Sequence, residues 1–163
     1  TRLEIARKMY RFRFPDLNFE NLSLSEMRGM EGVRIRNCYK EMGEKYGVTW
    51  KGRKYNRDQW DVCDDINTAI TFASQSLYAL CHSVIYMMGY LPQLGFIHET
   101  GYLPLVYDIA DLYKSDISIP ASFESVALHK GNQEEARLIF KERAEKFRLI
   151  DRMPEDIEKI FNE

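Results

Sequence analysis

The sequence lacks the short motifs that identify several common enzyme classes. No glycine-rich phosphate loop is present, because Gly29 and Gly32 lie inside an expected helix and no Gly-Lys-Ser/Thr follows them. There is no Gly-x-Ser-x-Gly elbow for a serine nucleophile, and no His-Glu-x-x-His zinc motif. Glu-x-x-His pairs are also missing, so a ferritin-type di-iron bundle lacks its ligands. Any chemistry must therefore come from a less standard set of residues.

Cysteine is scarce, and long hydrophobic runs are interrupted. The three cysteines, Cys38, Cys63 and Cys81, form no Cys-x-x-Cys pair and are odd in number, which is typical of reduced, packed thiols in a cytoplasmic protein. The most apolar stretch, residues 83–97, contains two glycines and a proline, which argues against a membrane span. No signal peptide is visible. We therefore expect a cytoplasmic protein with no membrane partner.

Length and composition fit one globular domain with a proper core, since the 163 residues are 45% hydrophobic and 13% aromatic. The net charge of −2 hides a division between the two parts of the chain. Residues 1–58 carry 14 basic against 8 acidic side chains, and residues 59–163 carry 9 against 17. A basic front part favours a polyanionic partner. Because the chain begins at Thr1 rather than Met, we expect it to be a piece of a longer protein.

Helical periodicity dominates the chain, and no stretch has the pattern of a strand. A Ser-x-x-Glu capping box at residues 23–26 predicts the start of one helix, and Gly47 its end. The expected fold is all-α, a compact multi-helix domain. The expected helices cover residues 1–14, 24–46, 64–88, 104–114, 123–128 and 133–150, and a terminal helix begins at Pro154, with Pro120 as an interruption.

Residues 94–111 combine an apolar background with one histidine and two aspartates. Asp108 and Asp111 are spaced i, i+3, which on a helix places both carboxylates on one face, roughly 5–6 Å apart at Cβ. Their apolar neighbours would draw that face into a core, where two like charges are costly unless a cation lies between them. A divalent metal with His98 as nitrogen ligand meets that need. Alternatively, the aspartates are solvated and His98 is an ordinary capping or core histidine.

Glu31 is a further acidic residue inside an apolar helical stripe. Gly29 and Gly32 flank it, and each costs about 1 kcal/mol relative to alanine in a helix interior. The close approach of another backbone or of a ligand to Glu31 would explain them. A mixed carboxylate and imidazole set of this kind suits Mg²⁺ or Mn²⁺. Such an ion polarises a phosphoryl oxygen during an in-line displacement at phosphorus.

Residues 49–60 read as an irregular loop in which cations alternate with aromatic rings. The cations suit backbone phosphates, and the rings of Trp50, Tyr55 and Trp60 suit stacking on bases or sugars. An equally good interpretation is a solvated basic loop whose tryptophans anchor it to the core.

Four motifs in order resemble the catalytic domain of the CRISPR-associated adaptation endonuclease and integrase family (Cas-one), and the tryptophan loop resembles its type I-E form. These motifs are Arg28-Gly29-Met30-Glu31-Gly32, Gly47-Val48-Thr49-Trp50-Lys51-Gly52-Arg53, Gly95-Phe96-Ile97-His98 and Tyr107-Asp108-Ile109-Ala110-Asp111. The resemblance covers about residues 2–125. It implies one helical domain over residues 1–163, with a catalytic core at about 1–130 and amphipathic C-terminal helices at about 131–163.

The resemblance also implies roles for individual residues. Glu31, His98 and Asp111 match the family's ligands for Mg²⁺ or Mn²⁺. Asp108 matches the family's accessory acidic position and Lys114 a cation near the scissile phosphate, which implies that both are catalytic. The residues implied to bind DNA are Arg28, Arg53, Tyr55 and Tyr78.

The implied chemistry is the insertion of protospacer DNA into a CRISPR repeat array. A 3′-hydroxyl attacks a phosphodiester at the edge of a repeat, and water in its place gives endonuclease activity on branched DNA. The implied partners are DNA, a small adaptation protein (Cas-two) and a second copy of the full-length protein, which dimerises through an N-terminal β-rich domain that this sequence lacks. The competing hypothesis is an all-helical module that binds DNA or protein without catalysis.

Overall fold

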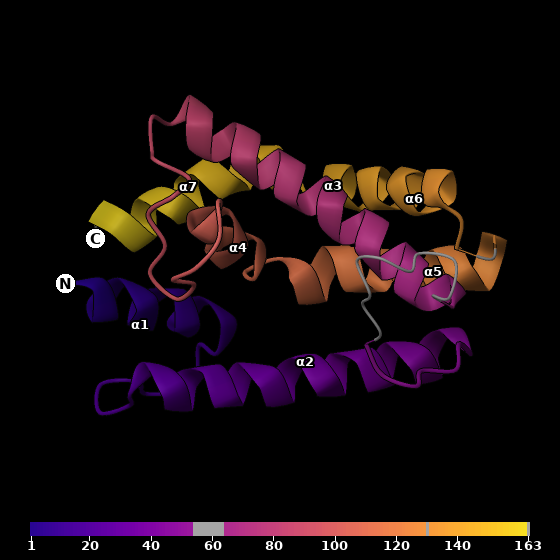
Figure 1. Ribbon diagram of the computed structural model, residues 1–163, viewed down its shortest axis with the longest axis horizontal. Helices are drawn as coiled ribbons and strands as arrows, with labels where there is room; N and C mark the ends of the chain where they lie inside the picture. The colour runs from indigo at the N-terminus through magenta and orange to yellow at the C-terminus, as the bar shows by residue number, and fades with distance from the viewer. Residues whose placement is uncertain (54–63, 130, 163) are drawn as a thin grey trace. The chain divides into compact units, whose positions relative to one another are not determined.

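The computed structural model describes residues 1–53, 64–129 and 131–162. Over these residues the fold is all-α, with no strand and with seven α-helices and one π-helix (Figure 1). No helix in this part of the chain has both the length and the apolar composition needed to cross a membrane. The elements are α1 (Arg2–Arg13), α2 (Leu24–Tyr46), α3 (Asp65–Met87), α4 (Pro104–Ala110), the π-helix η2 (Lys114–Ser118), α5 (Ile119–His129), α6 (Gln133–Lys146) and α7 (Leu149–Asn162).

The chain divides into two units that are interleaved in sequence. Unit 1 comprises Thr1–Arg34, Tyr78–Tyr113 and Leu149–Glu163, and unit 2 comprises Ile35–Leu77 and Lys114–Arg148. The two long helices α2 and α3 each contribute to both units. The expected division of one domain near residue 130 stays a prediction, and α6 and α7 fall in different units.

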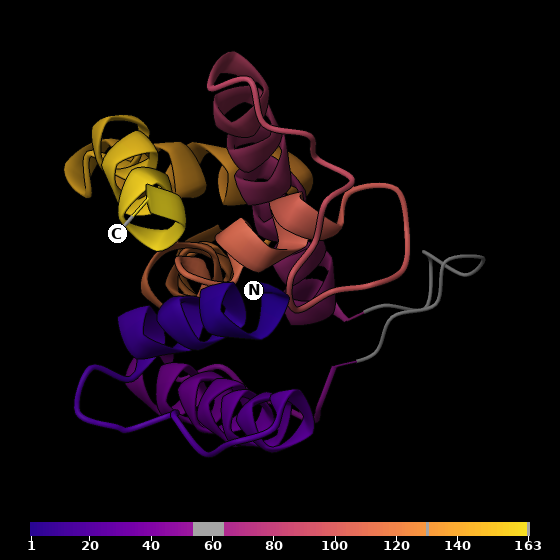
Figure 2. The ribbon, with the colours of Figure 1, turned by 90° about the vertical axis from the view of Figure 1, so that its left-hand side faces the viewer.

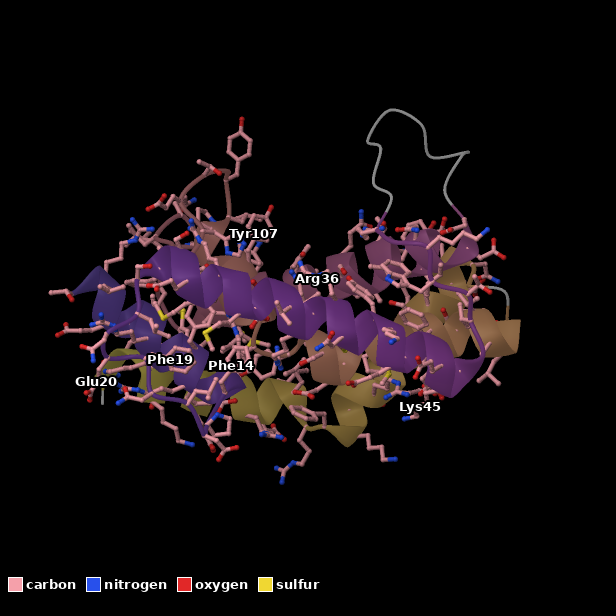
Figure 3. All side chains as sticks on the ribbon, turned by 90° about the horizontal axis from the view of Figure 1, so that it is seen from below. Phe14, Phe19, Glu20, Arg36, Lys45 and Tyr107 are labelled. Carbon is pink, nitrogen blue, oxygen red and sulfur yellow. The ribbon has the colours of Figure 1, made fainter. Side chains whose placement is uncertain are left out.

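Unit 1 is organised around the buried face of α1. Ala6, Met9 and Tyr10 on this face are almost fully buried, and α1 packs against α7, as Figures 1 and 2 both show. Phe19 follows α1 and is also fully buried, with its ring centroid 5.9 Å from that of Phe14 (Figure 3). Burial of several large side chains contributes about 1.5–3 kcal/mol each, which fixes the position of α1.

The predicted start of α2 is confirmed in detail. The Ser23 hydroxyl accepts from the Glu26 backbone amide at 3.3 Å, and the Glu26 carboxylate accepts from the Ser23 amide at 2.8 Å. This reciprocal arrangement satisfies amides that have no partner within the helix. Gly47 ends the helix with a φ of 64°, the left-handed conformation that glycine adopts without strain.

Unit 2 has its own core of Ile66, Ile70, Ile119 and Phe123. Trp50 packs on this core, with its ring stacked 4.5 Å from Tyr39. The structure therefore favours the anchoring alternative for Trp50 over base stacking. Trp60 and Tyr55 lie outside the described residues.

The helix that carries the aspartates is shorter than predicted, because α4 ends at Ala110 rather than near Lys114. From Leu112 on, backbone amides bond three residues back, as in Leu112 N to Ile109 O at 3.1 Å, and the π-helix η2 follows. Pro120 does not interrupt the next helix. It is the second residue of α5, where a missing N–H removes no intrahelical bond.

The C-terminal boundaries also differ from the prediction. Helix α6 ends at Lys146 rather than Ile150, and Arg148 adopts a φ of 54° between the two helices. Helix α7 begins at Leu149, so Pro154 lies inside it and forgoes one backbone hydrogen bond. Burial outweighs that loss, because Leu149, Met153, Ile157 and Ile160 form one fully buried stripe along α7.

Candidate active site

Asp108 on α4 organises the segment that precedes it in sequence. Its side chain is fully buried, and its carboxylate accepts the backbone amides of Phe96 at 2.6 Å, Ile97 at 3.0 Å and His98 at 2.9 Å. Gly95 enables this wrapping, since a Cβ there would lie 2.1 Å from the His98 carbonyl oxygen and 2.3 Å from Pro104 Cβ. The Gly-Phe-Ile-His sequence therefore folds around one buried carboxylate.

The same carboxylate orients the His98 ring. Nδ1 of His98 lies 2.7 Å from Oδ1 of Asp108, so a proton on Nδ1 leaves Nε2 as the acceptor. The imidazole is 40% exposed, and its Nε2 lies 4.0 Å from Oδ2 of Asp111. A carboxylate behind a histidine whose other nitrogen faces outward is the arrangement that orients histidine ligands in metal sites.

Glu31 on α2 lies in the same unit, with its side chain only 12% exposed. Its Oε1 accepts from Arg34 at 3.2 Å, whereas its Oε2 is buried without a hydrogen-bond partner among the described residues, 3.9 Å from Nη1 of Arg13. Burial raises the pKa of the Glu31 carboxyl, and Arg13 and Arg34 oppose that rise. The negative charge of Asp111 also raises the pKa of Glu31, because the two carboxylates repel each other.

Tyr10 on α1 interacts electrostatically with the same charged groups. Its ring is 1% exposed, and burial raises its pKa to about 12. The charges of Glu31 and Asp111 add to the rise, and those of Arg13 and Arg28 oppose it. One buried phenol thus lies within the field of both carboxylates and both arginines.

The predicted metal ligands are brought into one region of unit 1 but not into one coordination sphere. Over residues 1–53, 64–129 and 131–162, no three His, Cys, Asp or Glu side chains lie close enough together to hold a metal ion. The 4.0 Å between His98 Nε2 and Asp111 Oδ2 lies within the roughly 3–4.2 Å that separates two ligands of one ion with bonds of about 2.1 Å. Glu31 is paired with arginines instead.

The donor set nevertheless fits a hard divalent cation. It offers two carboxylates and one oriented imidazole nitrogen, and the unpartnered Oε2 of Glu31 is a buried acceptor that a cation would satisfy. Two mutually repelling carboxylates supply the charge that such an ion neutralises.

The other predicted site residues are divided between the units. In unit 1, Arg28 donates to the Ile97 carbonyl oxygen, and the Tyr78 ring packs edge-on against Tyr107 with centroids 5.1 Å apart. In unit 2, Lys114 is the first residue of η2, and Arg53 donates to the Asn67 carbonyl oxygen at 3.0 Å. The DNA contacts of these residues and of Tyr55 stay predictions.

Sequence reasoning missed the importance of Tyr10 and Arg13. Both lie on the buried face of α1, with Ala6 and Met9, at the i, i+3, i+4, i+7 spacing of a core stripe. An arginine in that stripe was the available signal, because a buried guanidinium requires a partner.

Gly29 is exposed on α2 beside the site, and a Cβ built on it would meet no atom of the described residues within 4 Å. The expectation that the close approach of another backbone explains this glycine is therefore wrong. Gly29→Ala is therefore expected to raise the free energy of unfolding by about 0.5–1 kcal/mol, because alanine is the better helix former. Denaturant unfolding measures this, with Gly43→Ala as the matched control in the same helix. There a Cβ would lie 3.0 Å from the Val48 carbonyl oxygen, so no gain is expected, and an equal gain in both variants would contradict the prediction.

Comparison with known proteins gives consistent matches over nearly the whole chain. Residues 6–152 match the family model described as CRISPR associated protein Cas1. The chain is 41% identical over 160 residues to a CRISPR-associated endonuclease Cas1 2 from Thermus thermophilus, covering 98% of this chain and 49% of that protein. It is 40% identical over 161 residues to its counterpart from Chlorobaculum tepidum, covering 98% and 54%.

Solved structures agree with these matches. The crystal structure described as a TtCas1-DNA complex has a TM-score of 0.91 and 41% sequence identity, covering 99% of this chain and 60% of that chain. A crystal structure of TtCas1 has a TM-score of 0.88 and 39% identity, covering 99% and 61%. The present chain spans about half the length of the curated relatives it matches.

Proposed function

This chain belongs to the family described as CRISPR associated protein Cas1, and we propose from that premise that it carries the active site of a metal-dependent DNA endonuclease and integrase. Its relatives from Thermus thermophilus and Chlorobaculum tepidum are CRISPR-associated endonucleases, which supports a nuclease, and the similar structure of a TtCas1-DNA complex supports DNA as the substrate. The observation that carries the proposal is the His98 ring, oriented by Asp108, with its Nε2 4.0 Å from the Asp111 carboxylate.

Glu31, His98 and Asp111 would hold one Mg²⁺ or Mn²⁺. When bound, such an ion polarises a phosphoryl oxygen and offsets the charge that develops at phosphorus. Asp108 acts through His98 and does not touch the substrate, because it is fully buried and already accepts three backbone amides and the ring nitrogen. It is a positioning residue.

The reaction is transesterification at a phosphodiester. The 3′-hydroxyl oxygen of a protospacer strand forms a bond to phosphorus, and the proton of that hydroxyl leaves to solvent. The bond from phosphorus to the 3′-oxygen of the repeat strand breaks, and this oxygen takes up a proton from solvent to become a 3′-hydroxyl. Water in place of the hydroxyl gives hydrolysis of branched DNA. Lys114 supplies positive charge near the scissile phosphate, and Arg28, Arg53, Tyr55 and Tyr78 contact the DNA.

The wider setting is part of the same proposal. The full-length protein forms a homodimer, works with the small partner Cas-two in the cytoplasm, and is of the type I-E form. The apolar face of α6, formed by Ala136, Ile139, Phe140 and Ala144, is buried, and α6 packs on α5 in unit 2. The partner protein is proposed to dock on α6, where it would contact the charged face of this helix.

Anomalous diffraction from crystals soaked in Mn²⁺ tests the metal site. We expect one peak within about 2.2 Å of His98 Nε2 and of an Asp111 carboxylate oxygen, with Glu31 as the third ligand. Absence of a peak there, with Mn²⁺ bound at other sites, would contradict the proposal. It would leave the competing function, an all-helical module that binds DNA without catalysis.

A further inference from the structure

Arg13 is the most deeply buried cation beside the candidate metal site. Its side chain is 1% exposed, and its guanidinium carbon lies 5.0 Å from the centroid of the Tyr10 ring. Nη2 donates to the Asp108 carbonyl oxygen at 3.1 Å. Within the described part of the chain, Nε and Nη1 are buried with no hydrogen-bond partner. Burying a charged group with unsatisfied donors is costly, so this position needs a physical explanation.

Nη1 of Arg13 faces the carboxylate of Glu31. It is 3.9 Å from Oε2 of Glu31, which is itself buried and unpartnered. A salt bridge with a charge-assisted hydrogen bond has an N–O distance of about 2.7–2.9 Å. Here the two charges attract each other, yet the carboxylate oxygen remains without a bonded donor.

Arg34 contacts the same carboxylate in a different way. Its side chain is 22% exposed and bonds Oε1 of Glu31 at 3.2 Å from one helical turn away. A partly exposed side chain can turn to solvent when a cation reaches Glu31. Arg13 cannot do so, because it is enclosed and anchored to the Asp108 backbone. Its charge is also permanent, since arginine does not deprotonate in proteins.

We propose that Arg13 is a positioning residue that stands in for the divalent ion. Without the ion, its charge offsets the repulsion between Glu31 and Asp111 and keeps the site folded. With the ion bound, the same charge repels it and weakens its binding. This inference rests on the proposed function, because it requires an ion that binds Glu31 and Asp111.

Arg13→Met tests it by removing the charge while keeping a side chain of similar length. The variant is expected to melt at a lower temperature than the wild type in a chelator. Its Kd for Mn²⁺ is expected to be about tenfold tighter, because a unit charge of the same sign has been removed from the vicinity of the ion. Mn²⁺ is therefore expected to raise its melting temperature more than that of the wild type. Isothermal titration and thermal melts at one neutral pH provide both measurements.

Two variants serve as controls. Arg13→Lys keeps the charge, and its Kd is expected to stay within about threefold of the wild type. Arg143→Met removes an arginine from unit 2 that is 27% exposed and pairs with a carboxylate directly, its Nε donating to Glu124 at 2.7 Å. It is expected to lower the melting temperature without changing the Kd. If Arg13→Met fails to fold in a chelator, refolding with Mn²⁺ is expected to rescue it.

Arg13→Met with an unchanged or weaker Kd for Mn²⁺ would overturn the inference and leave the metal site intact. Failure of Mn²⁺ to rescue an unfolded Arg13→Met would overturn it as well. If the wild type itself binds no Mn²⁺ at Glu31 and Asp111, the proposed metal site is wrong, and the inference falls with it.

Discussion

His98→Ala or Asp111→Ala is expected to reduce strand transfer and cleavage of branched DNA by at least about 10³-fold, because each removes a direct ligand of the proposed ion. The fold is expected to persist in both variants. The His98 ring is 40% exposed, so its removal leaves little of the core unfilled. Asp111 is the C-cap residue of α4 and lies outside the helix interior. Product formation with Mn²⁺, using the protein in its full natural length, measures the effect.

The controls for these variants are residues of the same type without the predicted role. His82→Ala replaces an exposed histidine on α3, and Asp116→Ala replaces an exposed aspartate on η2. Both are expected to retain activity within about threefold, since surface substitutions usually change little. Circular dichroism shows whether each variant is folded. Full activity in a folded His98→Ala or Asp111→Ala protein would exclude the proposed catalytic site.

Asp108→Asn is expected to affect stability and the site together. Each carboxylate oxygen of Asp108 accepts two hydrogen bonds. Asparagine has only one side-chain oxygen, and its NH₂ group would face N–H donors from which it cannot accept a hydrogen bond. The free energy of unfolding is expected to fall by roughly 2–5 kcal/mol. Metal affinity is expected to fall by about 10–100-fold, as when the partner behind a histidine ligand is lost.

A matched control separates positioning from stability in this case. Asp156 is also buried in unit 1, but it accepts one bond from the Tyr113 hydroxyl at 2.9 Å, which an asparagine oxygen can still accept. Asp156→Asn is expected to cost less stability and to leave the Kd for Mn²⁺ unchanged. Nitrogen NMR of His98 reports its tautomer directly. An unchanged tautomer and Kd in Asp108→Asn would show that Asp108 is structural only.

Helix positions were predictable where a local signal sets them. The Ser23–Glu26 capping box, the left-handed Gly47 and the periodicity of α3 are properties of neighbouring residues, and the structure confirms all three. The prolines were misjudged for the opposite reason. Pro120 lies in the first turn of α5 and Pro154 lies inside α7, because each helix begins at a buried residue, Ile119 or Leu149, and burial is not a local property.

The candidate site shows the same contrast. Glu31, His98 and Asp111 could be singled out because charged residues are rare in apolar surroundings. The structure places all three in unit 1 but not in one coordination sphere, so their role as metal ligands stays a prediction. Asp108 was predicted as part of the same acidic face. Its burial beneath three backbone amides could not be foreseen, since those amides come from a segment at least ten residues earlier.

The sequence by itself determined the helical class, the main helix starts and the residue types able to hold a divalent cation. These depend on spacing over a few residues, which hydrogen bonding and burial convert directly into helices. Only the tertiary structure decided that Asp108 orients His98 and that Arg13 faces Glu31. The partners of these groups come from segments that are distant in the chain, and the free energy of a buried charge depends on that enclosure rather than on its neighbours in the chain.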